Sequence, residues 1–269
     1  MGTPIGNLED ITLRAIRTLK EVDLIAAEDT RRTGKLLQHL QIKTPQISYH
    51  EHNQDYRTAE LITRLQQGMQ IALVTDAGMP SISDPGVKLV QAAIADKITV
   101  IPIPGGTAVV SALAASGLPT DRFIFEGFFP SKESERQARL ELLRSETKTV
   151  VFYEAPHRIL RTLQDLATVV GTDREIVLAR ELTKVHEEFW RGNIADAIAM
   201  YTLEREPKGE YTLVLKGAAE TSLITSEIEL KQELRQLLDQ GMTRSQASRQ
   251  LAKLTNRSRR EIYQLDLDS

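Results

Sequence analysis

Cysteine is absent from all 269 residues of this chain. That absence excludes a disulfide framework, a thiolate metal site and a cysteine nucleophile. Long apolar runs are absent as well, since none approaches the roughly 18 residues that a membrane-spanning helix requires. Residues 1–4 have neither the basic start nor the apolar core of a signal peptide. The sequence therefore predicts a cytoplasmic protein without a membrane partner.

Three common catalytic and nucleotide-binding motifs are also missing. The chain has no G-x-G-x-x-G dinucleotide fingerprint, no G-x-x-x-x-G-K-[ST] phosphate loop and no G-x-S-x-G nucleophile elbow. His50 and His52 are two residues apart, as metal ligands on one face of a strand would be. A third ligand is not evident beside them, so we expect no metal site.

The net charge hides a basic segment near the C-terminus. With 41% hydrophobic and 26% charged residues and a net charge of −3, the chain is typical of a soluble globular protein. Between Gln240 and Arg260, however, six residues are basic and none is acidic. The six are Arg244, Arg249, Lys253, Arg257, Arg259 and Arg260. This segment predicts binding to a polyanion.

Short apolar runs alternate with helical patterns through the first part of the chain. Strands are expected at residues 22–27, 47–49, 71–74 and 99–103, with amphipathic helices between them. The first helix carries Ile16 and Leu19, and Asn7 or Asp10 is expected to cap it. This alternation predicts a parallel, doubly wound α/β sheet.

The pattern changes after the turn residues at 117–120. Strands are expected at residues 122–129, 149–153, 175–180, 187–191 and 211–216, partly in succession, which predicts a mixed sheet with helices. Three short helices follow, with capping-box spacing at Thr243 and Gln246 and again at Ser258 and Glu261, as in a helix-turn-helix. We therefore predict an α/β domain at residues 1–118, a second α/β domain at 119–218 and a basic helical tail at 222–269.

A long polar loop in the first domain is expected to bind a ligand. It spans residues 76–86, follows the apolar run at 71–74, and contains two Gly, two Pro, two Asp and two Ser. In open α/β sheets, loops at the carboxyl ends of strands form the ligand crevice. Further segments rich in polar residues, Gly or Pro are at 2–10, 28–32, 50–53, 104–107 and 154–158. Each segment alone is as consistent with an ordinary turn as with a ligand contact. Together the segments predict an enzyme with a cleft.

Five segments together resemble one protein family. They are Gly2-Thr3-Pro4-Ile5-Gly6-Asn7-Leu8, Ala27-Glu28-Asp29-Thr30-Arg31, Ser48-Tyr49-His50-Glu51-His52-Asn53, the stretch from Thr75 to Gly86, and Tyr153-Glu154-Ala155-Pro156-His157-Arg158. On these motifs the chain resembles, from residue 2 to its C-terminus, the bacterial ribosomal RNA small subunit methyltransferase I group of the tetrapyrrole methylase superfamily. The resemblance implies S-adenosylmethionine-dependent 2′-O-methylation of the cytidine at position 1402 of 16S rRNA in the 30S subunit. It also implies a homodimer, with the cofactor between two α/β domains.

The resemblance assigns a set of residues to the cofactor. These are Pro4, Ile5, Ala77, Gly78, Met79, Ile82, Thr107, Ala108, Glu154, Leu182 and Thr212. Gly/Pro loops can hold such a molecule largely through backbone N–H and C=O groups. For Leu182 and Thr212, packing in the core is the alternative role.

A general base would help to remove the proton from the 2′-hydroxyl. Glu28 and Asp29 rank first, because Arg31 and Arg32 beside them could hold flanking phosphates, and Asp76 and Glu154 are further candidates. The alternative is that these carboxylates and arginines form an ion-pair lattice that only shapes the loop. The basic tail would bind rRNA phosphates.

Members of the family normally have a strand before the Gly-Thr-Pro-Ile-Gly-Asn turn, and this chain begins at the turn. The resemblance therefore implies either a start further upstream or a first sheet without its first strand. Two other functions stay open. A tetrapyrrole C-methyltransferase would need neither the basic tail nor the Glu28–Arg32 loop, and a ligand-sensing DNA-binding regulator would be supported by the tail alone.

Overall fold

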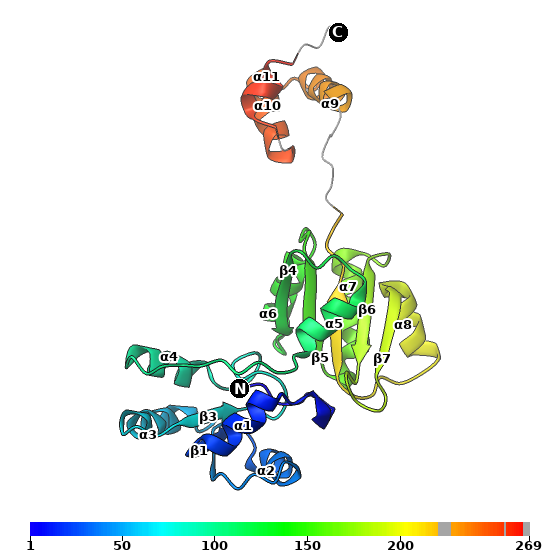
Figure 1. Cartoon of the computed structure of the whole chain (residues 1–269). Coiled ribbons are helices and arrows are strands. Elements are labelled where there is room, and N and C mark those ends of the chain that lie inside the picture. Colours follow the sequence, from blue (N-terminus) through cyan, green and yellow to red (C-terminus); the bar gives the residue numbers. More distant parts are fainter. Residues whose placement is uncertain (220–226, 256, 266–269) are drawn as a thin grey trace. The chain divides into compact units, whose positions relative to one another are not determined.

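The computed structural model describes residues 1–219, 227–255 and 257–265, without the side chains of Glu229, Lys253 and Leu254. The chain divides into two compact units, Met1–Gly217 and Ala218–Ser269 (Figure 1). No helix within the described ranges is both long and apolar enough to cross a membrane.

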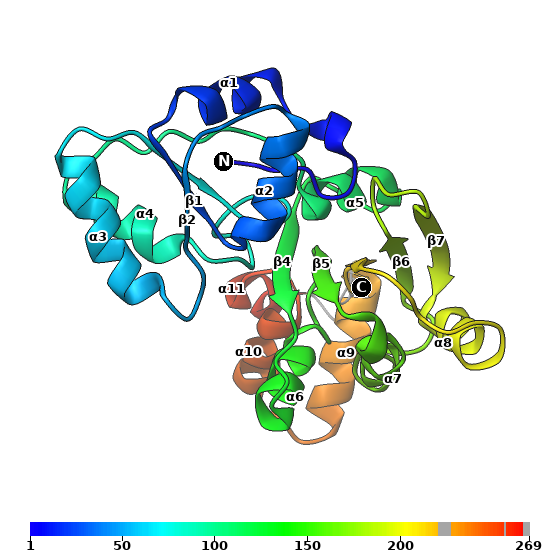
Figure 2. The same cartoon turned by 90° about the horizontal axis from the view of Figure 1, so that it is seen from below.

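The first sheet of the larger unit has three parallel strands in the order β2-β1-β3. The strands are β1 (Leu24–Ala27), β2 (Gln46–Ser48) and β3 (Ile71–Val74). The flanking helices are α1 (Leu13–Glu21), α2 (Thr30–His39), α3 (Gln54–Gln66) and α4 (Val87–Ala95). All of β1 is buried, because α1 and α2 pack on one face and α3 and α4 on the other (Figure 2). This confirms the predicted parallel, doubly wound arrangement.

The predicted cap of the first helix is wrong. Thr12, rather than Asn7 or Asp10, caps α1 by accepting a hydrogen bond from the Ala15 N–H at 3.1 Å. Asn7 caps the short 3-10 helix η1 (Leu8–Asp10) that comes before α1. Residues 8–10 form η1, so the regular helix begins only at Leu13.

The predicted strand at residues 99–103 is also wrong, since no strand forms there. The Ile103 carbonyl accepts a hydrogen bond from the Gly2 N–H at 2.9 Å. On the other side, the Met1 amino group donates to the Leu73 carbonyl of β3 at 2.9 Å. These single hydrogen bonds do not form a continuous ladder, so the apolar pattern of residues 99–103 alone does not produce a strand.

The second sheet is mixed, with five strands in the order β4-β5-β8-β6-β7. The β4–β5 pair is parallel and the other pairs are antiparallel, which confirms the predicted mixed sheet. The strands are β4 (Phe123–Phe128), β5 (Thr149–Glu154), β6 (Glu175–Arg180), β7 (Glu188–Asn193) and β8 (Tyr211–Leu215). The helices of this part of the chain are α5 (Ala108–Ser116), α6 (Glu133–Leu142), the 3-10 turn η2 (Pro156–Arg158), α7 (Ile159–Val170) and α8 (Ile194–Leu203).

Two hydrophobic clusters cover the two faces of the second sheet. Side chains of α6, α7 and α8 form the larger cluster with Phe152 and Leu178. Helix α5 forms the other cluster, in which Val109 and Leu113 pack against Val151 of β5. Thus α5 packs on the second sheet although it precedes the proposed boundary at residue 118, and the domain boundaries stay a prediction.

The described residues of the smaller unit form three helices, α9 (Glu227–Asp239), α10 (Arg244–Leu254) and α11 (Arg259–Tyr263). Leu234 of α9, Leu251 of α10 and Ile262 of α11 share one hydrophobic cluster. Both predicted capping boxes are present, at the starts of α10 and α11. The start predicted for the tail, at residue 222, lies outside the described residues.

Candidate active site

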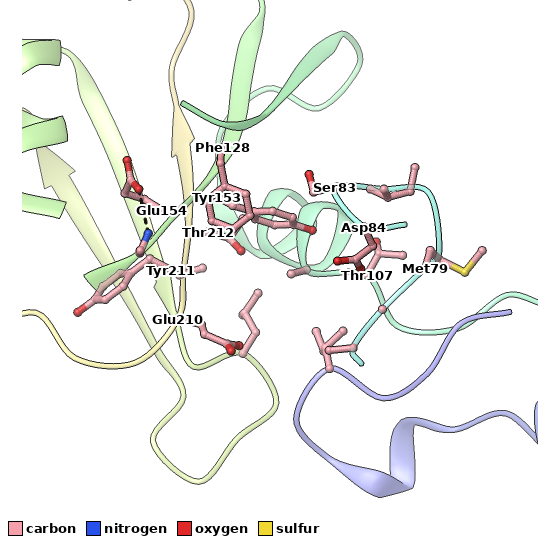
Figure 3. A pocket seen from close by; sticks show the side chains of 18 of the residues that line it. Met79, Ser83, Asp84, Thr107, Phe128, Tyr153, Glu154, Glu210, Tyr211 and Thr212 are labelled. Carbon is pink, nitrogen blue, oxygen red and sulfur yellow. Dashed lines mark hydrogen bonds between the residues drawn. The ribbon is translucent and has the colours of Figure 1, made fainter. Parts of the chain in front are cut away.

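A cavity of about 320 Å³ lies among loops that follow strands of both sheets (Figure 3). Small-molecule sites typically have volumes of roughly 300–1,000 Å³. Ten of the eleven residues expected at the cofactor line the cavity, and Pro4 does not. The ten are Ile5, Ala77, Gly78, Met79, Ile82, Thr107, Ala108, Glu154, Leu182 and Thr212. The structure therefore brings them together, while their binding of a cofactor stays a prediction.

The first wall of this cavity is the loop between β3 and α4, residues 75–86. Gly78 in this loop forms an isolated antiparallel bridge with Thr3, whose N–H donates to the Gly78 carbonyl at 2.9 Å. The Thr3 hydroxyl also donates to the Thr75 carbonyl at 3.0 Å. Gly78 has a φ of +87°, and Ser81 and Ser83 also have positive φ values. The shape of this wall is therefore set mainly by backbone conformation, which glycine permits at Gly78.

The second wall consists of the end of β5, the start of β8 and the loop after β6. Glu154, at the end of β5, is 2% exposed. Its Oε1 accepts a hydrogen bond from the Ala155 N–H at 2.9 Å, which Figure 3 shows, and pairs with the Arg158 Nε at 3.1 Å. Its Oε2 accepts from the Thr162 hydroxyl at 2.6 Å, with Arg136 at 3.9 Å. Glu154 thus holds the β5 end in place.

Arg136 extends this network away from the cavity. It is 1% exposed, and its Nε donates to Asp165 at 2.8 Å while Nη2 donates to the Thr162 hydroxyl at 2.8 Å. A buried charge is tolerated only when it is paired and hydrogen-bonded. Leu182 and Thr212 of the same wall are 7% and 4% exposed, and Leu182 also belongs to the core cluster under α5. Leu182 therefore both packs in the core and lines the cavity.

The three carboxylates expected to be catalytic lie together at the ends of β1 and β3, but they do not line the cavity. The Asp76 N–H donates to Glu28 Oε2 at 3.1 Å, and the Asp29 N–H donates to Asp76 Oδ1 at 3.1 Å. The Arg31 guanidinium donates to both oxygens of Asp29, at 3.0 and 2.7 Å. Arg32 Nε lies 3.4 Å from Asp76 Oδ2. Ion pairs of this kind were the alternative interpretation of the loop, and the catalytic role of the three carboxylates stays a prediction.

The Asp29 carboxylate accepts more hydrogen bonds than the carboxylates of Glu28 and Asp76. Its side chain caps α2 by accepting from the Arg31 N–H at 2.8 Å, in addition to its contacts with the guanidinium. The hydrogen bonds from the Arg31 side chain, followed by those from the Arg31 backbone, hold the pKa of Asp29 well below its usual range. A carboxylate stabilised in this way is a weak proton acceptor.

The sequence interpretation missed Asp84, Phe128 and Tyr153 among the residues of the cavity wall. Burial raises the pKa of Asp84 to about 6, and the negative charge of Glu28 adds to the shift. Burial also raises the pKa of Tyr153 to about 12. Asp84 could have been found, because it lies in the loop that the sequence singles out. Tyr153 opens one of the five segments that carry the family resemblance, but it was not assigned to the cofactor. Phe128 carries no sequence signal, since aromatic residues in strands are ordinary core residues.

The basic residues of the tail differ in their surroundings. The Arg244 guanidinium donates to the carbonyls of Tyr263, at 3.0 Å, and of Leu265, so it caps the end of α11. Arg259 donates to the Ser245 hydroxyl at 2.7 Å. The side chain of Lys253 lies outside the described residues. Among the six basic residues between Gln240 and Arg260, the arginines that are exposed and whose side chains form no hydrogen bond or ion pair within the described ranges are Arg249, Arg257 and Arg260.

Comparisons with known proteins place the chain in a family. The profile of the Tetrapyrrole (Corrin/Porphyrin) Methylases matches residues 1–198. The Ribosomal RNA small subunit methyltransferase I of Synechocystis sp. is 58% identical over 269 residues, covering 100% of this chain and 96% of that protein. The chain belongs to this methyltransferase family. The protein of the same name from Halalkalibacterium halodurans is 46% identical, covering 98% of this chain and 92% of its own.

Solved structures agree with this family at the level of the fold. The methyltransferase CobJ matches with a TM-score of 0.61 at 20% identity, covering 81% of this chain and 92% of its own. Uroporphyrin-III C-methyltransferase from Thermus thermophilus, in complex with S-adenosyl homocysteine, matches with a TM-score of 0.56 at 19% identity, covering 80% and 95%. This member of the rRNA small subunit methyltransferase I family therefore has the tetrapyrrole methylase fold and is a methyltransferase enzyme.

Proposed function

We propose that this enzyme transfers a methyl group from S-adenosylmethionine to the 2′-hydroxyl of the cytidine at position 1402 of 16S rRNA in the 30S subunit. The observation that carries the proposal is the convergence of ten sequence-predicted residues on one cavity. The relatives of this chain that are named ribosomal RNA small subunit methyltransferases support the choice of RNA as acceptor. We further propose that the protein acts in the cytoplasm as a homodimer.

The cavity fits the chemistry of S-adenosylmethionine. Its lining is mainly apolar, with Ile5, Ala108 and Leu182 available to cover the adenine and the ribose, and with the Thr212 side chain as a polar neighbour. A mostly apolar pocket with few polar groups binds and orients a small molecule. When bound, S-adenosylmethionine supplies a methyl group on a sulfonium, which is a good leaving group. The side chains around it exclude water and fix its orientation, which contributes to the rate through alignment.

The RNA side of the proposed site is the Glu28–Asp29–Asp76 lattice. The side chains of Arg31 and Arg32 are 87% and 68% exposed, so both can contact phosphates while Asp29 and Asp76 hold them. Phosphate contacts of this kind position an RNA without reading its sequence. We expect Glu28→Gln, Asp29→Asn and Asp76→Asn to weaken RNA binding and to leave the affinity for S-adenosylhomocysteine unchanged in calorimetry.

The decisive experiment is transfer of tritiated methyl groups from S-adenosylmethionine to 30S subunits that lack the modification, followed by mapping of the methylated nucleotide. We expect label on the 2′-oxygen of cytidine 1402. A parallel reaction offers uroporphyrinogen in place of 30S subunits, and a third offers duplex DNA. Label in uroporphyrinogen alone would replace the proposal by a tetrapyrrole methylase, and binding to one duplex without transfer would replace it by a DNA-binding regulator.

The role of the tail is tested with Arg249, Arg257 and Arg260, each changed to Ala in one triple variant. Each phosphate contact that is lost should lower the slope of log affinity against log salt by about 1. The control triple variant removes equal charge from exposed arginines of the larger unit that pair with nearby carboxylates, namely Arg17, Arg144 and Arg161. A salt slope equal to that of the wild type in the tail variant would refute the role of the tail.

A further inference from the structure

Three carboxylates line the cavity, and two of them are paired. Glu154 pairs with Arg158 at 3.1 Å, and Glu210 accepts a hydrogen bond from the Lys184 ammonium at 3.0 Å. Asp84 forms no ion pair with any lysine or arginine in the described part of the chain. A carboxylate that is not neutralised by a cation keeps its capacity to accept a proton.

The surroundings of Asp84 strengthen this capacity. Asp84 is half-buried in the loop between β3 and α4, on the first wall of the cavity. The charged and titratable groups that act on it are Glu28 from the end of β1, Asp76 from the end of β3 and Tyr153 from β5. Arg31 and Arg32, the cations nearest in the chain to Glu28, are held by Asp29 and Asp76. Proton uptake by Asp84 therefore relieves repulsion between carboxylates and removes a charge from a partly dry site.

The position of Asp84 connects the two parts of the proposed site. It lines the cavity that is proposed for the methyl donor, and it lies near Glu28 and Asp76 of the lattice that is proposed for the RNA. In Figure 3, Asp84 lies beside Ser83 and Thr107, with Phe128 and Tyr153 facing it across the cavity. An acceptor hydroxyl that reaches the donor from the RNA side would enter at this point.

We propose that Asp84 is the general base of the methyl transfer, an inference that rests on the proposed function. The 2′-hydroxyl gives its proton to the Asp84 carboxylate as its oxygen forms a bond to the methyl carbon. The bond between that carbon and the sulfonium breaks, and the sulfur keeps the electron pair as a neutral thioether. The protonated Asp84 then returns its proton to water.

The titration of Asp84 suits this role. A general base works best when its pKa lies near the working pH, and the pKa of Asp84 is raised to about 6. The reactive form is the carboxylate. The rate of the chemical step should therefore rise with pH up to about 6 and level off above it. If Asp29 were the base, the rate would not rise with pH near 6, because Arg31 lowers the pKa of Asp29.

The test is single-turnover methylation of 30S subunits between pH 5 and 8 by the wild type, Asp84→Asn, Asp84→Glu and the control Asp96→Asn. Loss of a general base lowers rates by about 10²–10⁴-fold. We expect such a loss in Asp84→Asn, partial recovery in Asp84→Glu, and a wild-type rate in Asp96→Asn, which removes an equal charge at the exposed end of α4. Calorimetry with S-adenosylhomocysteine shows whether the variants still fold and bind.

A second readout does not depend on activity. Carbon-13 NMR of the aspartate carboxyl groups in the free wild-type protein should contain one resonance that titrates near 6 and is missing from Asp84→Asn. The inference is overturned by a wild-type rate in Asp84→Asn, or by a wild-type pH profile without a limb near 6. It is also overturned if the carboxyl titrates at its ordinary value. Failure of the wild type to methylate 30S subunits at all is a different result, because it refutes the proposed function itself.

Discussion

The two walls of the cavity are built by different means. The loop between β3 and α4 takes its shape from backbone conformation, with Gly78 at a φ of +87° and a bridge to Thr3. The opposite wall takes its shape from regular strands, and its main polar group, Glu154, is held by side chains of the core. A wall made of loop backbone depends on which residues can adopt unusual φ values, whereas a wall made of strand ends depends on packing and buried charge.

This difference separates the residues that could change without loss of the fold from those that could not. In the first wall, Asp84 has no lysine or arginine partner among the described residues, at modest cost because it is only half-buried. In the second wall, Glu154 is 2% exposed and cannot be free, since an unpaired buried charge is strongly unfavourable. A carboxylate of the first wall can therefore take part in proton transfer, whereas the buried carboxylate of the second wall stabilises the fold.

The largest effect is expected at Glu154. Glu154→Ala leaves Arg136 and Arg158 without their shared carboxylate, and breaking a buried ion pair from one side costs about 3–5 kcal/mol. Urea denaturation should show this fall in the free energy of unfolding. The control Glu141→Ala breaks the exposed pair with Arg144 and should change stability little. Equal effects of the two changes would mean that the second wall does not depend on its buried charges.

A smaller effect is expected at Gly78, with Gly171 at the end of α7 as its matched control. Both have positive φ, +87° and +89°, which side chains rarely adopt, so alanine at either should lower the free energy of unfolding by about 1–3 kcal/mol. Only Gly78 lines the cavity. Gly78→Ala should therefore weaken S-adenosylhomocysteine binding in calorimetry, while Gly171→Ala should not. Equal affinities in the two variants would show that the first wall tolerates a change in its backbone.

The smallest effect is a pH-dependent change in stability at Asp84. Because its folded pKa of about 6 exceeds the ordinary value of 3.8, the folded state holds the proton more tightly. The stabilisation that Asp84 contributes is thus complete below 3.8 and is lost as the pH rises through about 6. Asp84→Asn does not suffer this loss, so its melting temperature should exceed that of the wild type above pH 6 and approach it near pH 4. A difference that stays constant with pH would contradict the raised pKa.

The sequence predicted the first wall better than the second. The loop at residues 76–86 stands out because Gly, Pro, Asp and Ser are unusual together outside turns and ligand loops. Phe128 does not stand out, because a strand that ends at a cavity has the same composition as one that ends in the core. The resemblance to a family supplied Leu182 and Thr212, which the pattern of apolar residues alone would have placed in the core.

The failures of sequence reasoning have a common physical cause. Residues 99–103 have the composition of a strand, but a strand also needs a ladder of hydrogen bonds to a neighbour, and the backbone hydrogen bond to this segment is the one from the Gly2 N–H to the Ile103 carbonyl. Likewise Asn7 is a good helix cap in isolation, yet a short 3-10 turn uses it first and leaves α1 to Thr12. In both cases the neighbours decided the outcome.

The sequence by itself determined the alternation of strands and helices, both capping boxes of the tail and the polar loop after β3, because these follow from periodicity and local hydrogen bonding. Only the tertiary structure decided which carboxylates are paired. The sequence alone does not distinguish the roles of five carboxylates, namely Glu28, Asp29, Asp76, Asp84 and Glu154. Their surroundings make Asp29 a helix cap, Glu154 a buried ion-pair partner and Asp84 an acid with a raised pKa and no ion-pair partner in the part of the chain that the structure describes. The pairing of Asp29 is local, since Arg31 is two residues away, whereas the burial of Glu154 beside Arg136 and the carboxylates around Asp84 depend on contacts between residues far apart in the chain.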